Sequence, residues 1–283
     1  MPKVIILDFG IFMHRGIFAS VNNPGIPATF TCLSMILGCL KRIGIEPEDT
    51  VIAACDFLRS WRKELDSNYK ADRAKKRDES KINFKEEYRN FNKLIEHLQN
   101  TTSWHFIQIE HLESDDIMAV SCRYFKDQEI ILVTYDSDLE QCWHYPNVKI
   151  FSPLKKSYKI KPANFNVYKL ISKKVEKETT DNLISPILNQ QDYETRLKCV
   201  TLIELPEWVE NSVCEKLRNL NDKSEQIEKI PFRIIRERFG DLYSDKSKII
   251  SYENCIEKEE RKNIRIKKKA KELKVKCAKN AEI

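Results

Sequence analysis

Four short apolar runs, each leading into acidic residues, constrain the fold of this chain more than any other feature. The runs are residues 3–7 (KVIIL), 50–55 (TVIAAC), 104–109 (WHFIQI) and 129–134 (EIILVT). Runs of this length and composition are typical of strands buried on both faces. Residues 31–43 (TCLSMILGCLKRI) have the pattern of an amphipathic helix, and a fifth short strand fits residues 148–151. Strands that alternate with helices predict a parallel sheet covered by helices on both faces.

Acidic side chains follow the ends of all four runs. They are Asp8, Asp56, Glu113, Asp115, Asp116, Asp136 and Asp138. Since the carboxyl ends of parallel strands lie at one edge of a sheet, where ligands bind, we expect these side chains to converge. Each also has a structural interpretation. Asp8 and Asp56 are suited to turns, and Ser114 or Asp115 is suited to cap a helix that begins there.

The convergence of so many carboxylates favours a metal site. Like charges within a few ångströms repel and cannot all remain ionised without cations. An all-oxygen site without His or Cys suits Mg²⁺ or Mn²⁺ rather than Zn²⁺. Two such ions, ~4 Å apart, would promote in-line displacement at phosphorus, which predicts phosphodiester hydrolysis. A haloacid-type phosphatase also places Asp at strand ends, but it requires an Asp-x-Asp motif, and here Asp8 is followed by Phe9 and Gly10.

The composition of the chain predicts a soluble intracellular protein. Of its 283 residues, 41% are apolar, which is enough for a sizeable core. Nine cysteines occur without a CxxC pair or a nearby histidine cluster, a pattern typical of reduced thiols in a cytosol. The first residues lead straight into an apolar run without the features of a signal peptide, and no run approaches the length of a membrane span. We expect a cytoplasmic protein with no membrane partner.

Several motifs, in the same order, resemble those of structure-specific 5′-nucleases, the family of flap endonucleases and polymerase-associated 5′→3′ exonucleases. The motifs are LDFGIFMHRGIFA from residue 7, ACDFLRSWRKELDSNYKADR from residue 54, LESDDIMAV from residue 112 and LVTYDSDLEQCWHYPNVKIFSP from residue 132. Within the family, the stretch LKCVTLIELP at residues 197–206 is similar to the T-even bacteriophage ribonuclease H subgroup. The resemblance extends over residues 3–209.

The resemblance implies an α/β, PIN-like 5′-nuclease fold, in which helices flank a central, mostly parallel sheet. We expect an α/β metal-binding nuclease domain over residues 1–162, with a helical arch at about residues 58–90. A mostly helical region with a shortened duplex-binding motif is expected over residues 163–256, and a basic tail over residues 257–283. The implied activity is a Mg²⁺-dependent 5′→3′ exonuclease and flap endonuclease that removes RNA primers and 5′ flaps during DNA replication.

The resemblance also implies which residues hold two Mg²⁺ ions, for which Mn²⁺ is expected to substitute. The acids named above match the metal ligands of the family, and the stretch ETTDN adds Glu178 and Asp181. Glu178 stands where the family has Asp, and Lys177 stands where it has Gly, so we expect a looser second metal site. The other interpretation of Glu178 is a plain surface acid.

Two departures from the family bear on the expected partners. Between Asp181 and Asp192 the chain reads NLISPILNQQ, in place of the Gly-rich hairpin with which the family grips duplex phosphates. Asp8 lies near the start of the sequence, which argues against the sliding-clamp contact of the phage relatives. The expected partners are RNA–DNA and DNA duplexes with 5′ ends or flaps. The resemblance adds a phage single-strand-binding protein and the cytoplasm of a bacterial host.

Basic residues at 59–89 are candidates for nucleic-acid contact. A charged helix in solvent is the usual interpretation of such a run, but this one resembles the arch that guides the 5′ strand. We expect phosphate contacts from Arg62, Lys63, Lys70 and Arg73. The resemblance gives Lys70 and Arg73 the further role of neutralising charge at the scissile phosphate. Tyr69 has two interpretations, stacking on a base or anchoring the arch to the core.

The stretch RKNIRIKKKAKELKVKCAK at residues 261–279 is the strongest charge asymmetry in the chain. It is either a solvated tail or a basic helix on nucleic acid, and the missing hairpin favours the second. An alternative function is nucleic-acid binding without catalysis on the same fold, but the retained acids argue against it. A third interpretation is a PIN-type single-strand ribonuclease, but the long basic insert after Asp56 argues against it.

Overall fold

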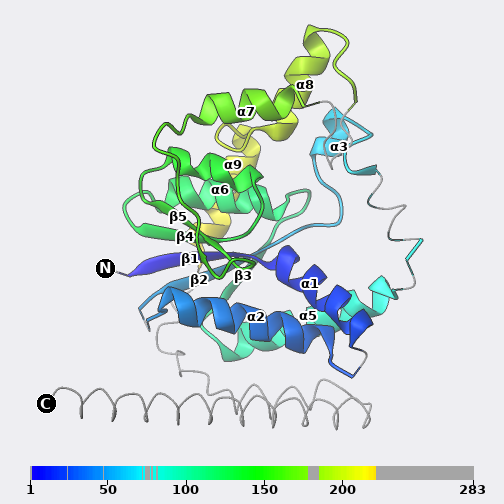
Figure 1. Ribbon diagram of the computed structural model, residues 1–283, viewed down its shortest axis with the longest axis vertical. Helices are drawn as coiled ribbons and strands as arrows, with labels where there is room; N and C mark the ends of the chain where they lie inside the picture. The colour runs from blue at the N-terminus through cyan, green and yellow to red at the C-terminus, as the bar shows by residue number, and fades with distance from the viewer. Residues whose placement is uncertain are drawn as a thin grey trace, which may run out of the picture.

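A six-stranded sheet, in the order β3-β2-β1-β4-β5-β6, forms the centre of the computed structural model (Figure 1). Strands β1 to β5 pair in parallel, and β6 is antiparallel to β5. The strands are β1 (Lys3–Asp8), β2 (Thr50–Cys55), β3 (His105–Gln108), β4 (Glu129–Val133), β5 (Val148–Ser152) and β6 (Ser157–Tyr158). The structure describes residues 2–220 except 24, 47, 72, 74–76, 78, 81 and 178–184. The predicted ligands Glu178 and Asp181 and the predicted tail, 257–283, lie outside these residues.

Alternate residues of the strands enter two separate cores. In β1, Ile5 and Leu7 belong to one apolar cluster, whereas Val4 and Ile6 belong to the other. Such alternation is the result of the two-residue period of a strand. Both sets are fully buried, so the sheet is covered on both faces, as the continuous apolar runs predicted.

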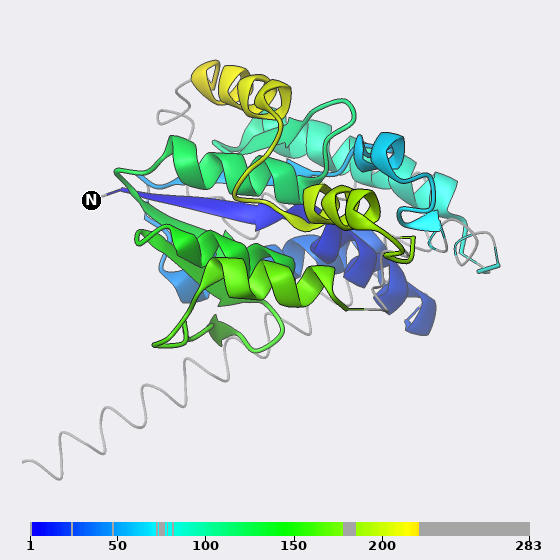
Figure 2. The ribbon, with the colours of Figure 1, turned by 90° about the horizontal axis from the view of Figure 1, so that it is seen from above.

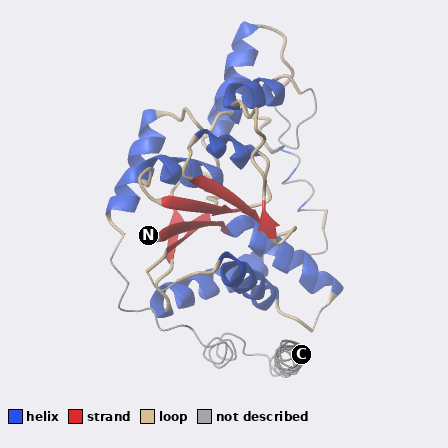
Figure 3. Cartoon of the chain, turned by 60° about the vertical axis from the view of Figure 1, so that its left-hand side comes forward, coloured by secondary structure: helices blue, strands red, loops and turns tan. Residues whose placement is uncertain are grey.

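Three helices cover the first face of the sheet: α1 (Phe9–Asn22), α2 (Ala28–Ile43) and α5 (Phe84–Thr101) (Figures 1 and 3). The predicted helix at residues 31–43 begins three residues earlier than expected, after Pro27. Helix α1 was not predicted. It follows β1 without a loop, because Asp8 ends the strand and its side chain also accepts the Ile11 N–H, 3.4 Å away, as the N-cap.

The second face is covered by α6 (Ser114–Tyr124), α9 (Glu207–Arg218) and the 3₁₀ helix η1 (Asp138–His144). Helix α9 is tied to α6 by an ion pair between Arg123 and Glu210. Helices α7 (Val167–Val175) and α8 (Gln190–Val200) pack on each other over a smaller apolar cluster (Figure 2). The α/β fold class predicted from the sequence is therefore confirmed, including helical elements beyond residue 162.

The predicted arch contains one short described helix, α3 (Arg62–Leu65), before the described part of the segment becomes discontinuous. In the described residues, no helix is both long and apolar enough to cross a membrane.

Two glycines provide a matched test of how closely α1 and α2 pack. A Cβ atom on Gly16 would overlap the backbone carbonyl of Ala28 and lie 3.3 Å from Cβ of Cys32, whereas a Cβ atom on Gly38 would meet nothing within 4 Å. We expect Gly16→Ala to lower the free energy of unfolding by about 1–3 kcal/mol through overpacking. Gly38→Ala should raise it by about 0.5–1 kcal/mol, because alanine favours the helix. Urea denaturation of both variants measures the difference, and equal effects would contradict the close helix contact.

Candidate metal and nucleic-acid site

Four carboxylates from four separate segments face one another at the carboxyl edge of the sheet. Asp8 ends β1, Asp56 follows β2, Asp115 lies in the first turn of α6, and Asp136 follows β4. A Cβ atom on Gly10 would lie 3.0 Å from Oδ2 of Asp56 and 3.5 Å from Oδ1 of Asp8, so glycine at this position leaves room between two carboxylates.

The electrostatics of these acids reflect their proximity. Burial, together with the charges of Asp56 and Asp136, raises the pKa of Asp8 to about 7. Burial, followed by the charges of Asp136 and Asp8, also raises the pKa of Asp115 well above its usual value. The charges of Asp56 and Asp136 act on Asp8, and those of Asp136 and Asp8 act on Asp115, so these four side chains lie near one another. Their predicted role as metal ligands stays a prediction.

Protein donors hold three of the carboxylates in place. The hydroxyl of Thr134 donates to Asp8 over 3.2 Å, and the Ser114 N–H donates to Asp56 over 2.8 Å. The backbone N–H of Asp138 donates to Oδ1 of Asp136 over 2.8 Å. In the described part of the chain, no group of three or more His, Cys, Asp or Glu side chains is arranged to hold a metal ion as it stands.

The chemistry of the site nevertheless fits a divalent cation. The four side chains offer only carboxylate oxygens, which Mg²⁺ and Mn²⁺ prefer, and the charges of Asp56 and Asp136 add to burial in raising the pKa of Asp8. The space beside Gly10 lies next to two of the acids. Like charges repel, and a bound cation would offset that repulsion.

Glu113 and Asp116, although adjacent in sequence to Asp115, are engaged elsewhere. Arg62 is 1% exposed, and its guanidinium makes two hydrogen bonds to Asp116, of 2.7 and 2.9 Å, and one to Glu113, of 3.1 Å. Asp116 also accepts the indole N–H of Trp61, at 3.2 Å, and the backbone N–H of Glu113, at 3.0 Å. Burial would raise the pKa of Glu113, but the cations Lys70 and Arg62 overcome this effect and lower it.

These contacts bear on three predicted roles. Asp116 is 0% exposed and both of its oxygens accept hydrogen bonds from Arg62, so it is the counter-ion of Arg62 here, and its predicted metal binding stays a prediction. Arg62 is buried against these acids rather than available to phosphate, so its predicted nucleic-acid contact is wrong. Glu113 accepts from Arg62 and Tyr69 on one oxygen and from Lys70 on the other, and its predicted metal binding stays a prediction.

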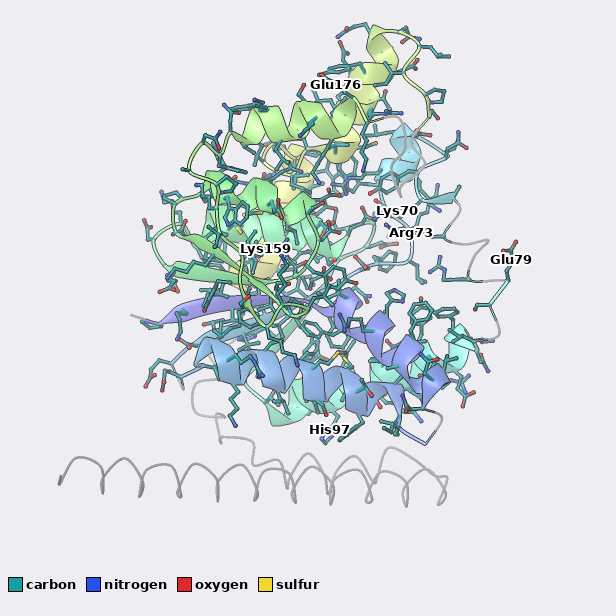
Figure 4. The ribbon with its side chains drawn as sticks, viewed as in Figure 1. Lys70, Arg73, Glu79, His97, Lys159 and Glu176 are labelled. Carbon is teal, nitrogen blue, oxygen red and sulfur yellow. The ribbon has the colours of Figure 1, made fainter. Side chains whose placement is uncertain are left out.

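The segment after α3 approaches the acids through two consecutive residues. Tyr69 is buried and its hydroxyl donates to Glu113 over 2.8 Å, so of its two predicted roles the structure supports the anchor. Lys70 forms an ion pair with the same carboxylate and has a positive φ of 54°, a conformation that is rare for lysine. Arg73 lies close to Lys70 on this segment (Figure 4). The phosphate contacts expected of Lys63, Lys70 and Arg73 stay predictions.

Asp138 lies apart from the other acids in its contacts. Its carboxylate forms an ion pair with Lys174 of α7. Sequence analysis did not identify Lys174 or Gly10. Gly10 had a sequence signal, because it lies two residues after a strand-end Asp, whereas Lys174 had none, because its contact joins α7 to a loop 36 residues earlier.

The raised pKa of Asp8 predicts how the metal-free protein responds to pH. Asp8 has a pKa of about 7 in the folded chain and 3.8 as its ordinary value, so its protonated form favours folding. This stabilisation is complete below about pH 4 and is lost as the pH rises through about 7. We expect Asp8→Asn, which keeps the N-cap, to be neutral near pH 4 and stabilising by on the order of 1–4 kcal/mol above pH 8.

Unfolding in a chelating buffer from pH 4 to pH 9 measures this difference, and Asp127→Asn, at an exposed position, is the control. Comparison with wild type cancels the opposing contribution of His14, whose pKa is lowered by burial. A difference that does not change with pH would contradict the crowding of the acids.

Comparison with known proteins places the chain in a family. The profile of the 5′-3′ exonuclease N-terminal, resolvase-like domain matches residues 3–176. Ribonuclease H of Enterobacteria phage T4 is 28% identical over 153 residues, which span 52% of this chain and 50% of the phage protein. The T5 D15 protein, crystallised with metal ions, aligns with a TM-score of 0.55 and 15% identity over 77% of this chain and 99% of that one, which shows a shared fold. The chain belongs to the 5′-3′ exonuclease family, through its N-terminal resolvase-like domain.

Proposed function

We propose that this protein is a Mg²⁺-dependent 5′→3′ nuclease that removes RNA primers and 5′ flaps during DNA replication. The proposal rests above all on the convergence of Asp8, Asp56, Asp115 and Asp136, where burial together with neighbouring charges raises the pKa values of Asp8 and Asp115. The chain spans half the length of the curated ribonuclease H that it matches, and the T5 D15 protein of similar fold was crystallised with metal ions. Both similarities favour a metal-dependent nuclease.

The acids of the site would hold two divalent ions, Mg²⁺ or Mn²⁺. When bound, these ions would lower the pKa of an attacking water and neutralise charge on the scissile phosphate. Asp8, Asp56, Asp115 and Asp136 are the proposed ligands, with Asp138 joining them where Lys174 withdraws. Glu178 and Asp181 remain proposed ligands from the motif alone.

Lys70 and Arg73 are proposed to position the phosphate. Lys70 is held beside the acids by Glu113 and has an uncommon backbone conformation, and we expect its ammonium to offset the charge that develops on the phosphate. The substrates that follow are RNA–DNA and DNA duplexes with 5′ ends or flaps. A bacterial cytoplasm, a single-strand-binding partner and a duplex contact by the basic tail belong to the same proposal.

The direct test of this function uses a 5′-labelled flap and an RNA-primed nick, each incubated with and without Mg²⁺. We expect short products from the 5′ end only with the metal. Absence of cleavage on both substrates with either Mg²⁺ or Mn²⁺ would contradict the proposal and favour a non-catalytic binding protein.

Two adjacent acids should respond in opposite ways to loss of charge. Asp115→Asn removes one member of the crowded cluster, so the metal-free protein should become more stable while cleavage falls by orders of magnitude. Asp116→Asn leaves the buried Arg62 without its full counter-charge and should destabilise the fold by about 3–5 kcal/mol. Melting temperatures without metal and cleavage rates with Mg²⁺, both measured well below the melting temperature, separate the two. Near-normal cleavage by Asp115→Asn would mean that this acid does not bind metal.

Loss of a phosphate contact should change the salt dependence of binding. We expect Lys70→Ala and Arg73→Ala each to weaken flap binding and to flatten the slope of log K against log salt by about 0.7–0.9. Lys149→Ala, at an exposed position on β5 that pairs with Glu129, is the matched control. Slopes equal to that of wild type in both variants would leave the segment as a solvated surface.

A further inference from the structure

Two lysines from different elements surround the loop that follows β4. Lys174 of α7 forms an ion pair with Asp138 and donates to the hydroxyl of Ser137 over 3.0 Å. Lys159, which follows β6, donates to the carbonyls of Tyr135 and Asp136, each at 3.3 Å, and to Glu140 at 2.9 Å (Figure 4). This side of the acid cluster therefore already contains two ammonium groups.

The other side of the cluster has donors of a different kind. The groups that hold Asp8 and Asp56 are the neutral Thr134 hydroxyl and the Ser114 backbone N–H. Asp138, in contrast, is paired with a lysine that is only partly exposed. Asp138 is thus paired with an ammonium group, whereas Asp8 and Asp56 accept from neutral donors.

We propose that Lys174 is a built-in counter-ion of Asp138, which a divalent ion must displace, so that the site binds one ion tightly and a second ion more weakly. This inference rests on the proposed nuclease function. An ammonium and a divalent ion compete for the same carboxylate lone pairs, and Asp138 cannot satisfy both at full strength. Lys174 is thereby a positioning residue that sets the affinity for the second ion.

The geometry of α7 supports this competition. Val167, Ile171 and Val175 bury one side of the helix, so the backbone of Lys174 stays fixed relative to the loop. The lysine side chain is a flexible four-carbon stem, so its ammonium can leave Asp138 for solvent without any movement of the helix. Displacement therefore costs mainly the ion pair itself.

The test is a calorimetric titration of the full chain with Mn²⁺, without nucleic acid. Wild type should show a tight and a weak binding event. Lys174→Met should tighten the weak event by about 1.5- to 5-fold, the range expected for loss of a partly exposed ion pair, and leave the tight event unchanged. Lys174→Arg retains the competing charge and should resemble wild type. Lys169→Met, an exposed lysine on the same helix, is the matched control.

Thermal unfolding in chelating buffer provides a second readout. Lys174→Met should melt at a lower temperature than wild type without metal and regain the difference with Mn²⁺. A lysine with only a structural role would lower the melting temperature without tightening the weak event. That result, or an equal effect of Lys169→Met, would overturn the proposal. Cleavage of the flap by wild type separates the two proposals. If wild type cleaves the flap but Lys174→Met does not change Mn²⁺ binding, only this inference is overturned. If wild type neither binds Mn²⁺ nor cleaves the flap, both proposals are overturned.

Discussion

The buried ion pair between Arg62 and Asp116 joins three parts of the molecule that are distant in sequence. The guanidinium contacts Asp116 and Glu113 at the start of α6, and its Nε donates to the carbonyl of Cys199 near the end of α8, 2.9 Å away. A charge buried to this extent is tolerated only when it is paired and its donors are satisfied. The base of the predicted arch, the acidic helix and the C-terminal helices are therefore held together by one residue that cannot lose its partners cheaply.

The same ion pair separates the acids of the sequence ESDD into two groups with different tasks. Successive helical residues point about 100° apart, so Asp115 faces the other carboxylates while Asp116 faces Arg62. Sequence analysis treated Glu113, Asp115 and Asp116 as one metal cluster. The predicted caps, Ser114 or Asp115, are wrong, because Glu113 is the N-cap and Asp116 accepts its N–H at the start of the helix. Asp115 belongs to the crowded group instead.

The local sequence predicted the strands well, but it predicted poorly which charged side chains are buried. Strand β2 was predicted to the residue and the other parallel strands within one or two residues, because both faces are buried and the apolar runs are continuous. Helix α1 was missed because the strand passes directly into it at Asp8 and two glycines interrupt its pattern. Of the seven acids expected to converge beyond the strand ends, Asp8, Asp56, Asp115 and Asp136 lie near one another. The burial of Arg62 was hidden, since it depends on Cys199, 137 residues away, and nothing in a run of arginines and lysines distinguishes the one that turns inward.

Buried polar contacts extend this network to both flanks of residues 178–184. Arg196 is buried and donates to the carbonyls of Val175 and Lys177 on one side and of Ser185 on the other. Ser185 in turn donates its N–H and hydroxyl to Asp66, directly after α3, over 2.7 and 3.0 Å. The described residues on both sides of residues 178–184 are therefore held by the guanidinium of Arg196. Ser185, on the C-terminal side, is also bonded to Asp66 at the base of the arch. Arg62 links that base to α6 and α8. One continuous set of buried polar contacts therefore joins the helix that carries Asp115, the segment that carries Lys70 and the residues on both sides of 178–184.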